Sequence, residues 1–394
     1  MASRRQFLFG TFAATAGAVI NAGAETRASI NPPPDWFVAR LPQMMDVAGT
    51  PGFAAIVVQR GRVVWEHHVG VLKAGDAKAV TPETMWPAAS LGKPLFAATV
   101  LGLVRERQLD LDRPLRDYVP DHASSDERTQ RVTARHVLSH TAGFPNWRNQ
   151  AGQSLTARFE PGSSFSYSGE GYYYLQRAVE HVTGKGVQQV AAARLFERLG
   201  MTSSTYCWRA DVPERLTVGH DRGVAGPYAQ YELRPQLWSY AEAHGRKFDS
   251  FTFEDVRSAM TEIPNAPPAL PNMMAPNVAG SLLTTARDYA AFLIALLDST
   301  GAALGLSRTE RTALTTSQIA LNRSMGWGLG LGLETPRGSL WHWGDNGGWK
   351  NFALVEPGEG AALVVFTNGS HGMNVAERFV SAATGQDHVA FQWL

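Results

Sequence analysis

The chain has 394 residues, and its 36 Lys and Arg residues nearly balance 35 Asp and Glu residues, which leaves a formal charge of +1. Because no basic stripe or charge block breaks this balance, the composition argues against nucleic acid or an anionic membrane surface as the main partner. A hydrophobic content of 44% is ordinary for a soluble globular protein, and the single cysteine, Cys207, permits neither an intramolecular disulfide nor a cysteine metal cluster.

The first residues have the pattern of an export signal. Arg4 and Arg5 precede an apolar run over 7–20 that contains no acidic residue, and small residues at 22–24 suit a cleavage site. We therefore expect residues 1–24 to be a bacterial signal peptide of the twin-arginine type. The run is too short for a typical membrane span, so the mature protein is expected in the periplasm or outside the cell, without stable membrane insertion. An uncleaved anchor or a disordered arm is the alternative.

The first predicted elements after this segment are a helix and a hairpin. Residues 36–47 have helical spacing of apolar side chains, and β-rich runs at 52–59 and 62–70 meet at Arg60-Gly61. Ser90 and Lys93 then stand at the start of a predicted helix over 94–107. Positions i and i+3 share one helix face, so the hydroxyl and the amine are expected within hydrogen-bond reach.

That pair suits nucleophilic catalysis. A serine needs a neighbouring base at neutral pH, and burial lowers the pKa of a lysine enough to let its amine accept the proton. A helix N-terminus beside Ser90 would favour a developing oxyanion. Taken alone, the pair is equally compatible with a helix cap followed by a surface lysine.

Helices dominate the middle of the chain and strands return near its end. Further helices are predicted over 172–183, 187–198, 285–297 and 373–384. A long Pro- and Met-rich loop is predicted over 263–276. Strands are predicted over 326–333, 339–343, 351–356 and 361–367. The alternating glycines of 326–332 favour a strand, because a nucleotide loop needs a strand before it and a helix after it. The simplest arrangement is an α+β fold, in which one antiparallel sheet is built from both termini, flanked by helices, with a mostly helical insertion.

Three further segments carry chemistry. Residues 161–172 present Tyr167 in a Gly- and Ser-rich loop, 137–144 end a helix in a turn, and 340–348 place His342 on a late strand. With Ser90 and Lys93, these segments make the chain resemble the serine β-lactamase and penicillin-binding-protein superfamily, closest to the class C-like branch with its esterases and D-aminopeptidases. The resemblance runs from about residue 50 to 370.

The resemblance implies a β-lactamase/transpeptidase-like fold and a set of roles. Residues 25–394 would form one β-lactamase-related domain, with an α/β part at about 35–92 and 300–394 and a helical part at about 93–299. Ser90 would be the acylated nucleophile, Lys93 its proton acceptor, and Tyr167 a proton shuttle whose pKa falls beside the lysine ammonium. The backbone N–H groups of Ser90 and Asp345 would form the oxyanion hole.

Two departures from the family pattern bear on the substrate. Gly169 stands where the family usually has the asparagine of its Tyr-x-Asn element, and His342-Trp343-Gly344 stands in place of its Lys-Thr-Gly strand. A histidine near its pKa substitutes only partly for the cation that holds a β-lactam carboxylate. The two changes weigh against a dedicated β-lactamase and favour an esterase or a peptide or amide hydrolase, and of these we predict a carboxylesterase-like enzyme. A D-stereospecific peptidase or amidase, a weak β-lactamase, and a non-catalytic protein that binds cell-wall peptides remain alternatives.

The remaining polar and aromatic residues are expected either to contact substrate or to have structural roles. Trp147 and Trp343 are the tryptophans that we expect to contact substrate, together with Gly169 and Gly344, whereas core packing is the default for most other aromatics. The half-match of residues 88–92 to an α/β-hydrolase elbow lacks its first glycine. His140 is expected to bond its own turn, and Cys207 to be buried. No metal and no cofactor is inferred, the partner is a small-molecule or peptide substrate, and the oligomeric state stays open.

Overall fold

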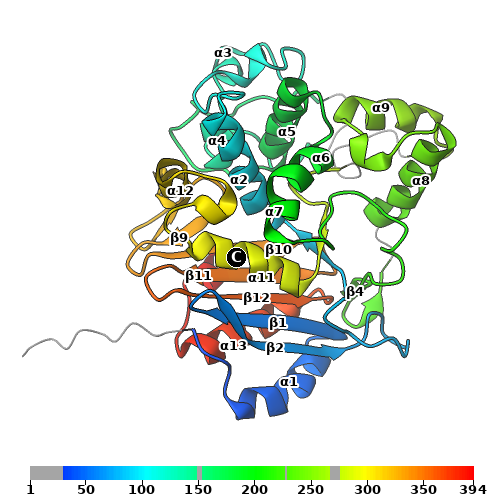
Figure 1. Ribbon diagram of the computed structural model, residues 1–394, viewed down its shortest axis with the longest axis vertical. Helices are drawn as coiled ribbons and strands as arrows, with labels where there is room; N and C mark the ends of the chain where they lie inside the picture. The colour runs from blue at the N-terminus through cyan, green and yellow to red at the C-terminus, as the bar shows by residue number, and fades with distance from the viewer. Residues whose placement is uncertain (1–29, 149–152, 227–228, 267–275) are drawn as a thin grey trace, which may run out of the picture.

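An eight-stranded antiparallel sheet forms one half of the molecule (Figure 1). The computed structural model describes residues 30–148, 153–226, 229–266 and 276–394. The sheet has the order β2-β1-β12-β11-β10-β9-β8-β7, so the first hairpin pairs with the last strand. The strands are β1 (Gly52–Gln59), β2 (Arg62–Gly70), β7 (Ile319–Ala320), β8 (Met325–Trp327), β9 (Gly332–Glu334), β10 (Ser339–Asp345), β11 (Lys350–Glu356) and β12 (Ala361–Thr367). This arrangement confirms the predicted fold class.

The sequence of the central strands explains why both faces of the sheet are covered. Along β1, Ala54, Ile56 and Val58 enter one hydrophobic core, and the alternate residues Phe53, Ala55 and Val57 enter another. Such double-sided burial requires a nearly continuous apolar strand with a period of two. The β1–β2 turn needs positive φ at both central residues, and Arg60 (φ 51°) and Gly61 (φ 71°) adopt it.

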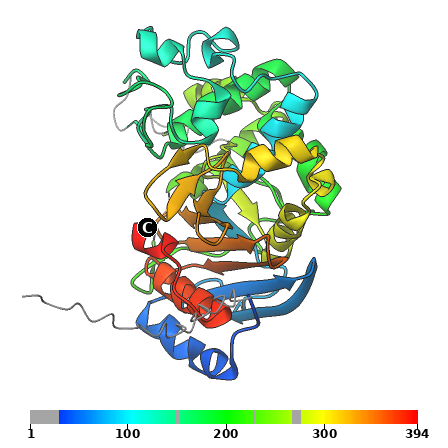
Figure 2. The same cartoon turned by 90° about the vertical axis from the view of Figure 1, so that its left-hand side faces the viewer.

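Helices cover the two faces of the sheet. On one face α1 (Asp35–Val47) and α13 (Gly372–Thr384) pack together (Figure 2). On the other face lie α2 (Gly92–Arg105) and α11 (Ala286–Leu297), which join the sheet to the helical half of the molecule. The short α14 (Ala390–Trp393) follows α13 near the end of the chain. The predicted helices over 36–47, 94–107, 285–297 and 373–384 are therefore confirmed to within two residues at each end.

Most of the remaining helices form the helical half, and two small strand pairs lie outside the main sheet. These remaining helices are η1 (Leu115–Asp117), α3 (Glu127–Gln130), α4 (Ala134–Leu138), α5 (Gly169–Thr183), α6 (Val187–Ala191), the π-helical turn η2 (Ala192–Phe196), α7 (Glu197–Leu199), α8 (Ala229–Ala243), η3 (Phe248–Ser250), α9 (Phe253–Glu262), η4 (Ala302–Leu304) and α12 (Arg308–Thr315). Strand β3 (Trp86–Ala89) pairs with β6 (Leu282–Thr284), and β4 (His220–Asp221) pairs with β5 (Val224–Ala225). The predicted helix over 187–198 is continuous but changes to π geometry in its second half.

The single strand predicted over 326–333 is wrong. The chain forms β8 and β9 instead, with a tight connection in which Gly328 N–H bonds the Leu331 carbonyl at 2.8 Å. Gly330 has a φ of 91°, and a Cβ there would lie 2.6 Å from Ala97 Cβ on α2. The glycines are therefore needed for a tight turn that packs against α2. The alternating pattern of glycines in the sequence does not by itself reveal this requirement.

Two predicted segments lie wholly or partly outside the described residues. They are the signal peptide over 1–24 and most of the loop over 263–276. Within the described part of the chain, no helix is both long and apolar enough to cross a bilayer.

Candidate active site

Ser90 occupies a sharp turn between β3 and α2. Ala89, the last residue of β3, adopts a φ of 53°, a left-handed conformation that is uncommon for a residue with a Cβ. The Lys93 N–H bonds the Ser90 carbonyl at 3.0 Å, and α2 begins at Gly92. A Cβ at Gly92 would meet the Val278 carbonyl at 2.8 Å, so glycine permits the close approach of this turn to the segment before β6. The turn thus presents the hydroxyl at the N-terminus of a long helix.

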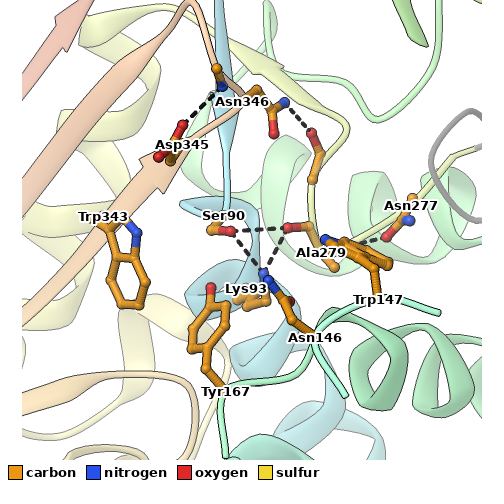
Figure 3. Close-up of a pocket in the computed structure, with 12 residues that line it drawn as sticks. Ser90, Lys93, Asn146, Trp147, Tyr167, Asn277, Ala279, Trp343, Asp345 and Asn346 are labelled. Carbon is orange, nitrogen blue, oxygen red and sulfur yellow. Dashed lines mark hydrogen bonds between the residues drawn. The ribbon is translucent and has the colours of Figure 1, made fainter. Parts of the chain in front are cut away.

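Lys93 has the environment of a proton acceptor. Its side chain is only 1% exposed, and its Nζ lies 2.9 Å from Ser90 Oγ and donates to the Ala279 carbonyl at 2.7 Å (Figure 3). Ser90 Oγ also donates to that carbonyl, at 3.3 Å. Burial holds the pKa of Lys93 well below its ordinary value. The neutral amine that a general base requires is therefore accessible, as the sequence predicted.

The Ala279 carbonyl is a site group that the sequence analysis missed. It belongs to the backbone just before β6, where residues 277–281 form a run of small and polar side chains. Asn277 fixes the segment because its Oδ1 accepts the Ala279 N–H at 2.8 Å. A backbone acceptor has no side-chain signature, so only this small-residue run could have drawn attention to it.

Tyr167 reaches the same centre but with a different pKa from the one expected. Its hydroxyl is buried and points toward Ser90 and Lys93 (Figure 3), and Lys93 Nζ lies 4.9 Å from its ring centroid. Burial raises the pKa of Tyr167 above its ordinary value, more than the neighbouring Ser90 hydroxyl lowers it. The expected fall in the pKa is wrong, because the burial that lowers the pKa of Lys93 also disfavours a phenolate. Tyr167 is thus a neutral proton donor at rest.

His342 is also close, but it is neither charged nor among the residues that line the cavity. Its imidazole is 1% exposed and stacks on Trp343, and its Nδ1 lies 2.7 Å from the Trp343 carbonyl. Burial, followed by the charge of Lys93, lowers the pKa of His342 to about 3. The expectation of a histidine near its pKa is wrong, because no water reaches the ring to stabilise the cation.

A cavity of about 360 Å³ opens above Ser90. Trp343 and Trp147 stand on opposite sides of Ser90 (Figure 3). Asp345 and Asn346 come from the end of β10 and the turn after it. The Asp345 carboxylate is paired with Lys350 at 2.6 Å and accepts the Gly347 N–H at 2.8 Å. The remaining lining residues are Lys93, Asn146, Tyr167, Asn277, Ala279, Gly280 and Gly347.

The two glycines expected to contact substrate lie behind the cavity wall. A Cβ at Gly344 would lie 2.2 Å from the Ala88 carbonyl, so this glycine lets β10 pass directly beside the strand that carries Ser90. Gly169 is the first residue of α5 and lies against the indole of Trp147. The structure therefore brings Ser90, Lys93, Tyr167, Trp147, Trp343 and Asp345 to the cavity, and places His342, Gly344 and Gly169 in support of it.

Other candidate groups lie outside this centre or have partners in the core. Cys207 is buried, its thiol lies 3.6 Å from the Phe248 carbonyl, and burial raises its pKa. His140 Nδ1 accepts the Ser168 N–H at 3.0 Å, which ties its turn to the start of α5. Among residues 30–148, 153–226, 229–266 and 276–394, no group of three His, Cys, Asp or Glu side chains is arranged to hold a metal ion.

Comparisons with known proteins identify the family. A family model described as Beta-lactamase matches residues 37–385. Penicillin-binding protein 4 of Amycolatopsis lactamdurans is 28% identical over 330 residues, which cover 76% of each chain. Esterase EstB of Burkholderia gladioli is 26% identical over 205 residues, or 45% of this chain and 52% of that one. The D-aminopeptidase of Brucella anthropi is 27% identical over 188 residues, or 43% of this chain and 34% of that one.

A solved structure has the same fold. The octameric penicillin-binding protein homologue from Pyrococcus abyssi superposes with a TM-score of 0.68 at 20% identity, covering 90% of this chain and 78% of that one. At this identity the likeness concerns the fold alone.

Proposed function

The chain belongs to the Beta-lactamase family and is a serine hydrolase, and from this premise we propose that it hydrolyses carboxylic esters through an acyl-enzyme on Ser90. The observation that carries the proposal is the contact between Ser90 Oγ and a buried lysine whose pKa is lowered. A serine activated in this way attacks acyl carbonyls without a metal or a cofactor.

The proposed reaction proceeds in two halves. Ser90 Oγ forms a bond to the acyl carbon while its proton passes to Lys93 Nζ, and the N–H groups of Ser90 and Asp345 stabilise the oxyanion. The neutral phenol of Tyr167 donates a proton to the departing alcohol and recovers one from the Lys93 ammonium. Water then attacks the acyl carbon and gives its proton to Lys93, and Lys93 passes a proton to Ser90 Oγ as the bond to the acyl carbon breaks and the acid leaves.

The lack of a fixed positive charge among the described basic groups of the cavity favours an uncharged substrate. Of the described residues that line it, Lys93 is the one basic side chain, and its pKa is lowered. His342 stays neutral down to a pH of about 3. A substrate carboxylate would lose its hydration without gaining a fixed cation, which disfavours β-lactams and peptides with a free C-terminus.

Hydrolysis of amides is the second candidate. Asn146, Asn277 and Asn346 line the cavity, and their amide groups offer the hydrogen bonds that a peptide or amide substrate needs. Relatives named D-aminopeptidase and penicillin-binding protein support this alternative. A purely binding role is disfavoured, because binding does not require a lysine buried against a serine hydroxyl.

We propose a small-molecule or peptide substrate as the partner and export as the destination. The paired arginines and apolar run of residues 4–20 support export.

The test is a parallel hydrolysis assay of the protein without residues 1–24, wild type beside Ser90→Ala. The substrates are short-chain p-nitrophenyl esters, a D-alanyl anilide and nitrocefin. Ester turnover that Ser90→Ala abolishes, with little cleavage of nitrocefin, is the expected result. Dominant turnover of the anilide or nitrocefin would replace the esterase proposal, and unchanged turnover by a folded Ser90→Ala variant would refute Ser90 as the nucleophile.

A further inference from the structure

Trp147 is held in place by the residues on both sides of it. The Asn146 carbonyl accepts the N–H groups of Gly169 (3.1 Å) and Glu170 (3.0 Å), and Asn146 Oδ1 also accepts the Gly169 N–H at 3.0 Å. Arg148 donates its backbone N–H to Glu170 Oε1 at 2.8 Å and pairs its guanidinium with Oε2 at 3.0 Å. The Glu170 side chain is fully buried, so this ion pair is shielded from solvent on one side. Both flanking residues are thus fastened to the first turn of α5.

The indole fills the space beside Gly169. A Cβ at that position would lie 2.4, 2.6 and 2.8 Å from three carbons of the Trp147 ring. These are ring atoms of a side chain whose neighbours are anchored, so they cannot shift as the end of a flexible chain would. The φ of Gly169 lies outside the positive region, and a side chain is therefore excluded by the tryptophan rather than by the backbone.

The geometry of the site sets which part of the substrate meets Trp147. With the proposed oxyanion hole and proton donor, a carbonyl carbon attacked by Ser90 would direct its oxygen to the end of β10 and its leaving group to the Tyr167 hydroxyl. Tyr167 packs against Trp343, with ring centroids 4.8 Å apart, so the leaving group lies on the Trp343 side. The third substituent, the acyl chain, then points to the opposite side, where Trp147, Asn277 and Ala279 line the cavity (Figure 3).

We propose that Trp147, seated on Gly169, is the residue that selects the acyl group, and that it favours apolar acyl chains longer than acetyl. The inference rests on the proposed function, because it needs an acyl-enzyme on Ser90. An indole packed on Gly169, with both neighbouring residues bonded to α5, offers apolar contact at little entropic cost. Trp343 faces the leaving group and has no such role toward the acyl chain.

Two substrate series separate these roles. One holds p-nitrophenol constant and lengthens the acyl chain from acetyl to hexanoyl, and the other holds acetyl constant and varies the alcohol among methanol, p-nitrophenol and 1-naphthol. Trp147→Ala is expected to lower the kcat/KM ratio of hexanoyl to acetyl ester about tenfold, with less than about twofold change in the alcohol series. Trp343→Ala should change the alcohol series instead. Trp36→Ala, at a tryptophan that is 56% exposed on α1, is the matched control and should change neither.

Gly169→Ala tests the contact itself. Alone it should displace the indole and reproduce the selectivity of Trp147→Ala. In the Trp147→Ala background it should add less than about twofold, because the clash is gone. Additive effects, or equal effects of Trp147→Ala on both series, would overturn the inference while leaving the ester hydrolase intact. Absence of any turnover that depends on Ser90, with esters or with the corresponding anilides, would instead overturn the proposed function and this inference with it.

Discussion

At the scale of single residues, one property of the site governs the others, namely the burial of its titratable side chains. Burial lowers the pKa of Lys93, lowers the pKa of His342 to about 3, and raises the pKa of Tyr167. Each shift favours the neutral form, as expected when a low dielectric penalises charge. The result is a proton acceptor and a proton donor on either side of one serine hydroxyl, while the Asp345 carboxylate in the cavity wall is paired with Lys350. Such a site offers no electrostatic attraction to an ionised substrate.

A neutral amine in the core is costly for stability, and Lys93→Met tests this cost. We expect turnover to fall by about two to four orders of magnitude, the usual contribution of a general base. The free energy of unfolding at pH 7 should rise by about 1 kcal/mol, because a thioether is cheaper to bury than an amine. Urea unfolding of both proteins measures the difference.

The pH dependence of that difference follows from the lowered pKa. Between the lowered pKa of folded Lys93 and 10.5, the ordinary value for lysine, the unfolded chain binds a proton that the folded chain releases, so the stability of the wild type rises with pH in that window. The methionine variant lacks this dependence. Its advantage should therefore shrink between pH 7 and 9.5, and an advantage that stays constant or grows would contradict the assignment of a lowered pKa to Lys93.

At the scale of elements, the parts that could be predicted were those with a periodic pattern. The bounds of β1, β2 and β12 were predicted correctly, since apolar residues run through these strands and turn residues flank them. Strands β3 and β6 have only four and three residues, too few to show a period, yet their pairing positions Ser90 and the Ala279 carbonyl. Helix α9 was also missed, although Thr252 and Asp255 form a capping box at its start.

The sequence predicted those residues of the site that act through a side-chain hydroxyl, amine or indole. Ser90, Lys93, Tyr167, Trp147 and Trp343 do meet at one cavity. Their pKa values could not be predicted in full, because burial depends on the packing of segments distant in sequence. The supporting roles of Gly344 and Gly169 escaped prediction for the same reason, since a glycine gives no sign of which neighbour approaches it.

The crossing of β10 and β3 is the contact between elements on which the site depends, and Gly344→Ala tests it. The added Cβ, 2.2 Å from the Ala88 carbonyl, should push the strands apart and displace Asp345. We expect a loss of about 1–3 kcal/mol in stability and about 100-fold in kcat. Thermal unfolding and ester assays measure both.

Gly102→Ala on α2 is the control for that change. The nearest atom to its added Cβ would be a guanidinium nitrogen of Arg194 at 3.7 Å, so there is room. Replacing a helical glycine should stabilise α2 by about 0.5–1 kcal/mol and leave activity unchanged. Equal losses in the two variants would show that the close approach at Gly344 has no special importance.

At the scale of the whole molecule, strand β10 of the sheet carries Trp343 and Asp345, whereas Trp147 and Tyr167 belong to the segment between α4 and α5 in the helical half. Ser90 stands where the two halves meet, because β3 leads into α2 there. Asn351 Nδ2 bonds the Pro87 carbonyl at 2.9 Å and fixes β3 to the main sheet. The cavity thus belongs to neither half alone.

The sequence of the first residues predicts that the whole protein is exported. Replacing Arg4 and Arg5 together by Lys should leave the protein in the cytoplasm of a bacterial host, because the twin-arginine pathway requires that pair. Arg40→Lys, a change on helix α1, is the control and should be exported normally. Immunoblots of periplasmic and cytoplasmic fractions measure the distribution, and periplasmic protein from both variants would refute a twin-arginine signal.

The pairing of the first strand with the last has a consequence for biosynthesis. Gly52 N–H bonds Asn368 Oδ1 at 2.6 Å across 316 positions of sequence, and β1 lies between β2 and β12. While the ribosome is still making the middle of the chain, the hairpin of β1 and β2 has an apolar edge with no neighbour to cover it. The sheet can close only after β12 leaves the exit tunnel. Closure of the sheet is therefore a late, non-local step of folding, and until then the hairpin of β1 and β2 is exposed to aggregation.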